Sequence, residues 1–323
     1  MRKEFIGKTI AFIGDSITQH GHYIYHLRAY FQGKKEKCFV YNRGVGGNRA
    51  IMAQYILDDE ICSLTPDYAV ICFGVNDLGI WLYDSLKPIT QEVLKKRKAR
   101  DDEYIKAYEI LIDELTAKGI KPIVASPYAV DNFIVENEEI ETVADNNEKE
   151  DEIKPSFYKR KTFQNINEAL KGYSNRLQAL CVQKGVEFWD FFLETYKQMQ
   201  TDRGLYSKDG IHFSQDKGHS VLAQTVLKFL GCEIPDGFTK TAENDKIFEM
   251  EQFERSIGYI ARCTPMNRLF GDYTEEDIVA YANKIKDDES VYSGSRISAK
   301  NYLAHRHELP QIQAEIKRLT EQL

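Results

Sequence analysis

The sequence predicts an α/β fold in which a parallel sheet is covered by helices on both faces. Short runs rich in Val, Ile, Phe, Tyr and Cys alternate with segments of helical periodicity over residues 8–231. The composition, 42% hydrophobic and 29% charged, is typical of a soluble globular protein, and no apolar run approaches the ~20 residues of a membrane-spanning helix. Strand–helix alternation of this kind places the active site at the carboxyl ends of the strands.

Five segments are expected to form the strands. They are short, they are enriched in β-branched, aromatic and cysteine residues, and they cover residues 9–13, 38–41, 68–73, 122–125 and 186–189. The clearest helix lies over residues 104–118, and Gly119 ends it. Its buried stripe is predicted to consist of Tyr104, Ile105, Tyr108, Leu111, Ile112 and Leu115.

Two segments interrupt the alternation. Residues 135–153 hold nine acidic residues against one lysine, so charge repulsion predicts a mobile surface loop over about 135–155. Residues 78–102 form a long connection, which we expect to be a lid, a substrate wall or surface decoration. Its basic run, residues 95–100, is expected to form a solvated helix face or loop rather than a phosphate-binding patch.

The alternation ends after Gly231, which predicts an α/β domain over residues 1–234 and a helical C-terminal extension over residues 235–323. Helical patterns in the extension cover residues 246–262, 274–286 and 309–323. An apolar stripe in the last pattern must be covered by the α/β domain or by a second copy of the chain, so the extension is a candidate contact in a homo-oligomer. The stripe consists of Ile312, Ile316, Leu319 and Leu323.

Charge and cysteine usage exclude several classes of function. The formal net charge of −7 gives no electrostatic footprint for nucleic acid. The short apolar patch near the N-terminus does not resemble a signal peptide, so we expect a cytoplasmic protein without a membrane partner. The six cysteines contain no C-x-x-C pair, which argues against a zinc knot or a disulfide scaffold. Cys38 and Cys72 are expected to be buried as small hydrophobic residues.

Four polar blocks accompany the predicted strands. The first strand is followed by G-D-S at residues 14–16, the second by N-R-G-V-G-G-N at 42–48 and the third by G-V-N-D at 74–77. The fourth block, D-G-I-H at residues 209–212, precedes the last helix of the α/β domain. If the strands are parallel, all four blocks meet at the same edge of the sheet.

These blocks contain the groups that nucleophilic catalysis requires. A sharp turn after a buried strand can expose the hydroxyl of Ser16, but this hydroxyl needs a base and donors for an oxyanion. The spacing of Asp209 and His212 lets the carboxylate accept a hydrogen bond from Nδ1 and leaves Nε2 to deprotonate Ser16. Glycine amides of the second block, the Asn76 side chain and the Ser16 amide would supply the oxyanion donors.

The ordered blocks G-D-S, N-x-G-x-x-G, G-x-N-D and D-x-x-H resemble the SGNH hydrolase superfamily, also called the GDSL-like esterases and lipases, over residues 8–231. The resemblance implies a three-layer α/β/α sandwich, flavodoxin-like, with a five-stranded parallel sheet. Ile17 stands where the name-giving motif has leucine, and the acidic run and the C-terminal extension lie outside the family's minimal pattern. The roles that it implies are Ser16 as nucleophile, Gly47 as backbone oxyanion donor, Asn76 as side-chain donor, Asp209 as orienting residue and His212 as base.

Two cofactor hypotheses are less favoured. The glycines of the second block suggest a dinucleotide-binding loop, but Arg49 stands where that motif requires glycine and the block follows the second strand. His22 and His26 would share a helical face, yet no H-E-x-x-H motif or acidic third ligand accompanies them. We therefore expect neither a cofactor nor a metal.

Other polar residues near the blocks have structural or substrate-contacting interpretations. Asp15 and Asp77 are expected to cap helices or hold loops, and His219 is expected on a helix surface. Three side chains are candidates to line the substrate site, namely His20, Arg49 and Trp81.

The sequence thus predicts a metal-independent serine esterase that acts on a small-molecule ester through an acyl-enzyme. Polar and aromatic residues beside the blocks favour acetyl esters of a carbohydrate or another polar alcohol over chains of about eight carbons. A lysophospholipase or thioesterase, an acyltransferase, and a non-catalytic binding module in which the extension covers the site remain alternatives.

Overall fold

The computed structural model describes residues 1–85, 87–132, 163–234, 246–268 and 274–323. All five predicted strands are present and form one parallel sheet in the order β2-β1-β3-β4-β5. Their bounds are Thr9–Gly14 for β1, Phe39–Gly44 for β2, Tyr68–Cys72 for β3, Lys121–Ala125 for β4 and Glu187–Trp189 for β5. In the sheet register, Gly14 at the end of β1 is paired with both Gly44 and Cys72. The first three polar blocks therefore begin at the same edge.

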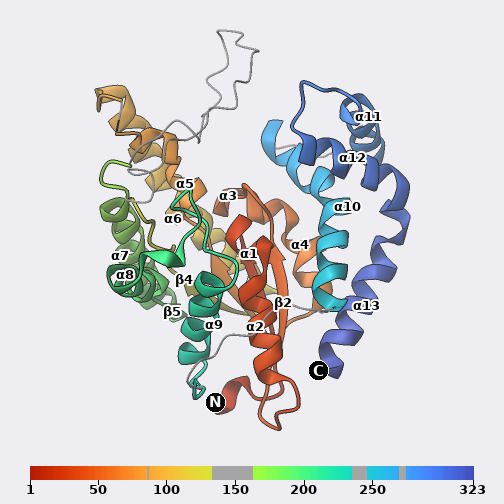
Figure 1. The fold of residues 1–323 in the computed structure, drawn as a ribbon, viewed down its shortest axis with the longest axis horizontal. Helices are drawn as coiled ribbons and strands as arrows, with labels where there is room; N and C mark the ends of the chain where they lie inside the picture. Colours follow the sequence, from red (N-terminus) through yellow and green to blue (C-terminus); the bar gives the residue numbers. More distant parts are fainter. Residues whose placement is uncertain (86, 133–162, 235–245, 269–273) are drawn as a thin grey trace.

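Helices cover both faces of the sheet and give the three layers expected (Figure 1). Ala11 and Ile13 of β1 belong to a core on one face, and Ile10 and Phe12 belong to a core on the other, because successive strand residues point to opposite faces. The helices of the first core are α3 (Ala50–Ala53), α4 (Leu57–Glu60), α5 (Val75–Leu78), α6 (Gln91–Ala117) and α7 (Ile166–Lys184). Those of the second are α1 (Ser16–His20), α2 (His22–Phe31), α8 (Phe191–Thr201) and α9 (Lys217–Phe229).

The C-terminal extension consists of α10 (Lys246–Arg268), α11 (Glu275–Ile285), α12 (Ser293–His305) and α13 (Leu309–Gln322). Helices α10 and α13 lie beside the edge strand β2 (Figure 1). A small core holds the extension together and consists of Ile257, Ile260, Ala282, Ile285, Ala299 and Tyr302. Ile316 of the predicted stripe is fully buried, whereas Leu319 and Leu323 stay partly exposed. The extension thus packs against the α/β part of the same chain.

Several expected boundaries differ from the structure. Strand β2 continues through Asn42, Arg43 and Gly44, which the sequence placed in a loop, because the pairing with β1 extends to Gly14. The long connection over residues 78–102 is largely helical, since α6 begins at Gln91 and carries the basic run. Helix α12 was not predicted. The acidic stretch, residues 135–153, lies outside the described residues.

Short 3₁₀ turns connect the larger elements, at Lys3–Phe5, Gln54–Ile56, Cys62–Leu64, Ile80–Tyr83, Arg203–Leu205 and Arg306–Glu308. Cys38 and Cys72 are buried, as predicted. Within the described part of the chain, every helix is too short or too polar to cross a lipid bilayer.

Candidate active site

Ser16, His212 and Asp209 form a continuous hydrogen-bonded chain. The Oγ atom of Ser16 lies 2.8 Å from Nε2 of His212, and Nδ1 of His212 lies 2.6 Å from Oδ2 of Asp209. Ser16 is the first residue of α1 and directly follows the turn after β1. Asp15 accepts a hydrogen bond from the Ile17 amide at 3.0 Å and caps α1, so its expected structural role is confirmed.

The Asp209 carboxylate is oriented by its own turn. Its Oδ1 atom accepts hydrogen bonds from the amides of Ile211 and His212 at 2.8 and 2.9 Å, which leaves Oδ2 for the imidazole. Burial opposes ionisation of Asp209, but the hydrogen bonds from His212 and the backbone lower the pKa of Asp209 below its usual range. Asp209 is therefore a carboxylate at neutral pH.

The charge of Asp209 sets the behaviour of His212. Burial alone would lower the pKa of His212, but the hydrogen bond and the charge of Asp209 raise it above the usual 6.5. With Nδ1–H donated to Asp209, the neutral ring presents an unprotonated Nε2 to the Ser16 hydroxyl. This arrangement can remove the proton of Ser16 while the hydroxyl attacks a carbonyl carbon.

A second histidine lies against the first. The rings of His20 and His212 are stacked, with centroids 5.2 Å apart and planes 21° apart. His20 is exposed at the end of α1. The structure therefore brings this candidate lining residue to the site.

The glycine-rich block forms a tight turn beside β1. The Asn48 amide donates to the Val45 carbonyl at 3.0 Å, and Gly47 within this turn has a φ of 74°, a conformation that favours glycine. The Val45 amide donates to the Gly14 carbonyl at 2.8 Å, and the Gly46 amide donates to the side chain of Gln19. Gly47 is thereby held near the start of α1, and its backbone is exposed.

Asn76 adjoins this turn. Its side-chain Nδ2 donates to the Asn48 carbonyl at 3.1 Å, so one amide hydrogen connects the second and third blocks and the other is available to a ligand. Arg100 of α6 donates to the carbonyls of Asn76 and Asp77 at 3.2 and 2.9 Å. Asp77 accepts from the Ala50 amide at 2.9 Å, as its expected structural role requires, and burial raises the pKa of Asp77 to about 7.

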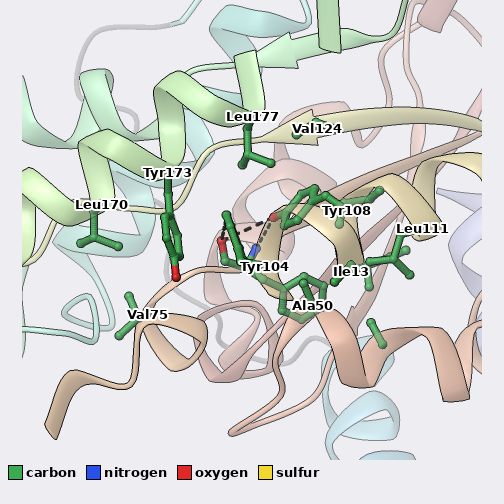
Figure 2. Packing of buried hydrophobic residues seen from close by; sticks show 14 of the residues in the cluster. Ile13, Ala50, Val75, Tyr104, Tyr108, Leu111, Val124, Leu170, Tyr173 and Leu177 are labelled. Carbon is green, nitrogen blue, oxygen red and sulfur yellow. Dashed lines mark hydrogen bonds between the residues drawn. The ribbon is translucent and has the colours of Figure 1, made fainter. Parts of the chain in front are cut away.

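Two tyrosines of α6 fix the backbone just before Asn76 (Figure 2). The Phe73 amide donates to the hydroxyl of Tyr108 at 2.8 Å, and the Phe73 carbonyl accepts from the hydroxyl of Tyr104 at 2.8 Å. The ring of Tyr104 stacks on Tyr173 of α7 at a centroid distance of 4.0 Å. The core thus positions the backbone that leads into the third block.

The side chains of Arg49 and Trp81 contact residues of α6. Nη1 of Arg49 lies 2.6 Å from Oε2 of Glu103, and the guanidinium of Arg100 lies 4.7 Å above the Trp81 ring. Their substrate contacts therefore remain a prediction. Gln19, by contrast, was not assigned from the sequence, although it lies between Ser16 and His20 and orients the glycine-rich turn.

The expectation that His219 lies on a helix surface is wrong. His219 is 1% exposed, and its ring stacks on Tyr23 at a centroid distance of 6.0 Å. The reason is that this face of α9 packs against α2. Burial and the nearby histidines lower the pKa of His219 well below 6.5, so the residue is neutral at neutral pH.

Comparisons with solved structures agree with this fold. A variant of Axe2, described as an acetyl-xylooligosaccharide esterase from Geobacillus stearothermophilus, is 20% identical and superimposes with a TM-score of 0.52 over 71% of this chain and 97% of its own. BT4096, described as a gut microbial diltiazem-metabolizing enzyme, is 23% identical with a TM-score of 0.52 over 70% of this chain. The match spans only 47% of BT4096.

No curated protein matches the sequence significantly. The profile of the GDSL-like Lipase/Acylhydrolase family matches residues 12–220, which contain all four polar blocks. Since this match covers more than half of the chain, the protein belongs to the GDSL-like lipase/acylhydrolase family and is a serine carboxylic ester hydrolase.

Proposed function

We propose that this protein hydrolyses acetyl and other short-chain esters of a polar alcohol, such as a carbohydrate, through an acyl-enzyme on Ser16. The observation that carries the catalytic part is the chain of hydrogen bonds from Ser16 to His212 at 2.8 Å and from His212 to Asp209 at 2.6 Å. Ser16 attacks the ester carbonyl while His212 takes its proton, and Asp209 stabilises the imidazolium.

The oxyanion is held by three N–H donors in this proposal. They come from the ends of three adjacent strands: the Ser16 amide after β1, the Gly47 amide after β2 and the Asn76 side chain after β3. Ser16 is the first residue of α1, so its amide has no acceptor within that helix. His212 then protonates the leaving alcohol and activates the water that releases the acid.

Published descriptions of a relative support the roles. Solved structures of Axe2 include variants described as catalytic mutants, in which a serine, an aspartate and a histidine three positions beyond the aspartate are replaced by alanine. Asp209 and His212 have the same spacing. The acetylxylan substrate named for Axe2, together with the polar Gln19, His20 and Asn76 around Ser16, favours a small acyl group on a hydroxylated alcohol.

A chain-length series tests this proposal. kcat/KM is measured with the p-nitrophenyl esters of acetate, butyrate and octanoate, and the acetate ester is expected to be the best substrate because each added methylene gains only ~0.8 kcal/mol and needs an apolar wall. A fluorophosphonate probe is expected to label Ser16 in the same protein. Ser16→Ala should abolish turnover and labelling, whereas Ser290→Ala, which changes an exposed serine of the extension, should preserve both.

The outcomes of these measurements distinguish the proposed function from the alternative functions. A steady rise of kcat/KM from acetate to octanoate would replace the small-acyl assignment with a lysophospholipase or thioesterase. A folded protein without turnover or labelling would contradict the catalytic assignment. If acetate is preferred, a screen of acetylated sugars against simple acetate esters decides whether the alcohol is a carbohydrate.

A further inference from the structure

Helix α10 of the extension occupies the open side of the edge strand β2 (Figure 1). Among the described strands, β2 pairs only with β1, so alternate N–H and C=O groups point away from the sheet. Arg255 of α10 donates hydrogen bonds to two of these carbonyls, those of Asn42 and Gly44. The outward amide of Asn42 donates to Oε1 of Glu251, also on α10, at 3.4 Å. Side chains of α10 thus bond the backbone groups that a further strand would bond.

Buried charges determine where α10 docks. Arg28 of α2 forms a salt bridge with Glu251 at 2.6 Å, and Arg43 of β2 forms one with Glu254 at 3.5 Å. These four side chains and Arg255 are each at most 4% exposed. An unpaired charge in such an environment would be costly, so a shift of α10 along β2 would break both pairs at once.

The strand end that Arg255 holds is continuous with the glycine-rich turn. Gly44 is the last residue of β2, and a Cβ atom added there would lie 2.3 Å from the Gln19 backbone nitrogen, so β2 touches the backbone of α1. The Gln19 side chain accepts from the Gly46 amide, and the backbone carbonyl of Gln19 accepts from the side chain of Gln252 of α10 at 3.3 Å. Helix α10 therefore contacts both segments that flank the turn.

A side chain of α10 also packs on the turn. Tyr259 belongs, with Val45 and Met52, to a small apolar cluster that lies apart from the two main cores. Tyr259 is one helical turn beyond Arg255, on the same face of α10. The extension thus bonds the carbonyl of Gly44, before the turn, and packs on the cluster that contains Val45.

We propose that α10 completes the oxyanion hole of the esterase, with Arg255 as a positioning residue that fixes the glycine-rich turn and hence the direction of the Gly47 N–H. This inference rests on the proposed role of Gly47. Oxyanion donors act through preorganisation, because a donor that must reorient during the reaction loses much of its effect on the transition state. Without Arg255, the carbonyls of Asn42 and Gly44 lose their buried donors, and the hydrogen bonds that hold the turn come from the α1 side and from Asn76.

The test compares Arg255→Ala and Arg255→Lys with Lys317→Ala. Lys317 of α13 also donates to a backbone carbonyl of the α/β part, that of Leu64 at 3.3 Å, but far from the turn. We expect Arg255→Ala to lower kcat on p-nitrophenyl acetate about 10- to 100-fold with KM nearly unchanged, since a weakened oxyanion donor acts in the transition state. The rate of fluorophosphonate labelling should fall in parallel, while its amplitude, which counts folded sites, stays complete.

Arg255→Lys keeps the positive charge but cannot bond both carbonyls, so its kcat is expected to lie between those of the wild type and Arg255→Ala. This variant replaces Arg255→Ala in the test if Arg255→Ala does not fold. Lys317→Ala should lower the melting temperature without changing kcat per labelled site. Hydrogen exchange of the residue 45–47 amides should accelerate in the Arg255 variants alone, and this readout does not require turnover. An inactive, unlabelled wild-type protein would refute the proposed function. Wild-type kcat and exchange rates in the folded Arg255 variants would refute the role of α10.

Discussion

The turn that carries Asp209 and His212 is held mostly by hydrogen bonds among its own residues, whereas the turn that carries Gly47 is held mostly by residues from distant parts of the chain. In the first, the Ser207 hydroxyl and the amides of Ile211 and His212 all donate to Oδ1 of Asp209, and the Ser207 amide donates to the His212 carbonyl at 2.8 Å. These partners all lie within six consecutive residues, and the Asp131 amide, which donates to the Gly210 carbonyl at 2.8 Å, adds one bond from outside the turn.

In the second turn, the Asn48 amide donates to the Val45 carbonyl at 3.0 Å, and the other bonds that hold the turn come from distant residues. Its amides donate to the Gly14 carbonyl and to Gln19, and the strand that leads into it is bonded by Arg255, which is 211 positions away from Gly44. The comparison teaches that the proposed acid–base pair and the proposed oxyanion donors, although they would act on one reacting group, depend on different parts of the molecule. Substitutions can therefore affect one without the other.

The largest effect is expected from Asp209→Asn. The asparagine keeps an oxygen that can accept from the Ile211 and His212 amides, so the turn should persist, but the charge that orients His212 is lost. We expect kcat to fall about 10⁴-fold with little change in the melting temperature, because the ring adopts the wrong tautomer. Asp202→Asn is the control, since Asp202 also accepts a local amide hydrogen bond, from Gly204 at 3.0 Å, outside the site. A loss below tenfold in Asp209→Asn would show that the carboxylate is not part of the acid–base pair.

The same difference between local and distant contacts determines which features can be predicted from the sequence. The five strands and four polar blocks follow from periodicity and from motifs of a few residues, so the sequence alone is enough to propose Ser16, Asp209 and His212 as site residues. The docking of α10 cannot be identified in this way. Glu251, Glu254 and Arg255 resemble a solvated helix face, and the partner of Glu251, Arg28, lies 223 positions away.

Other differences have the same physical origin. Asn42 to Gly44 were expected in a loop because asparagine and glycine are poor strand formers, yet pairing with β1 and the buried Arg255 of α10 keep them in β2. His219 was expected at the surface because a single polar residue in an amphipathic helix is usually exposed, and only the packing of α9 on α2 buries it. Tertiary contacts override local preference at both places.

A smaller effect is expected from Gly47→Ala, and it tests the second turn. A Cβ atom there would meet no atom within 4 Å, so the cost comes from the φ of 74° alone. That strain, roughly 1–2 kcal/mol, should displace the turn and lower kcat by about tenfold without moving the pH dependence. Gly119→Ala is a matched control because Gly119 has a φ of 76° and equally open surroundings after α6. Both variants should lose similar stability, and an equal kcat in both would mean that the Gly47 amide does not act on the oxyanion.

The smallest effect is a shift of the acidic limb of the pH profile of kcat/KM, and it depends only on the turn that carries Asp209 and His212. His212 must be neutral to accept the Ser16 proton, so activity should rise with pH through the pKa of His212, which Asp209 raises above 6.5. In Asp209→Asn the charge of Asp209 is absent while burial still disfavours the imidazolium, so the limb of the residual activity should move to a lower pH than in the wild type. Gly47→Ala and Arg255→Ala leave the surroundings of His212 intact and should keep the wild-type midpoint despite their lower kcat. A midpoint that moved with the Arg255 substitution would show that the two turns are coupled, and a midpoint unchanged by Asp209→Asn would assign the limb to a group other than His212.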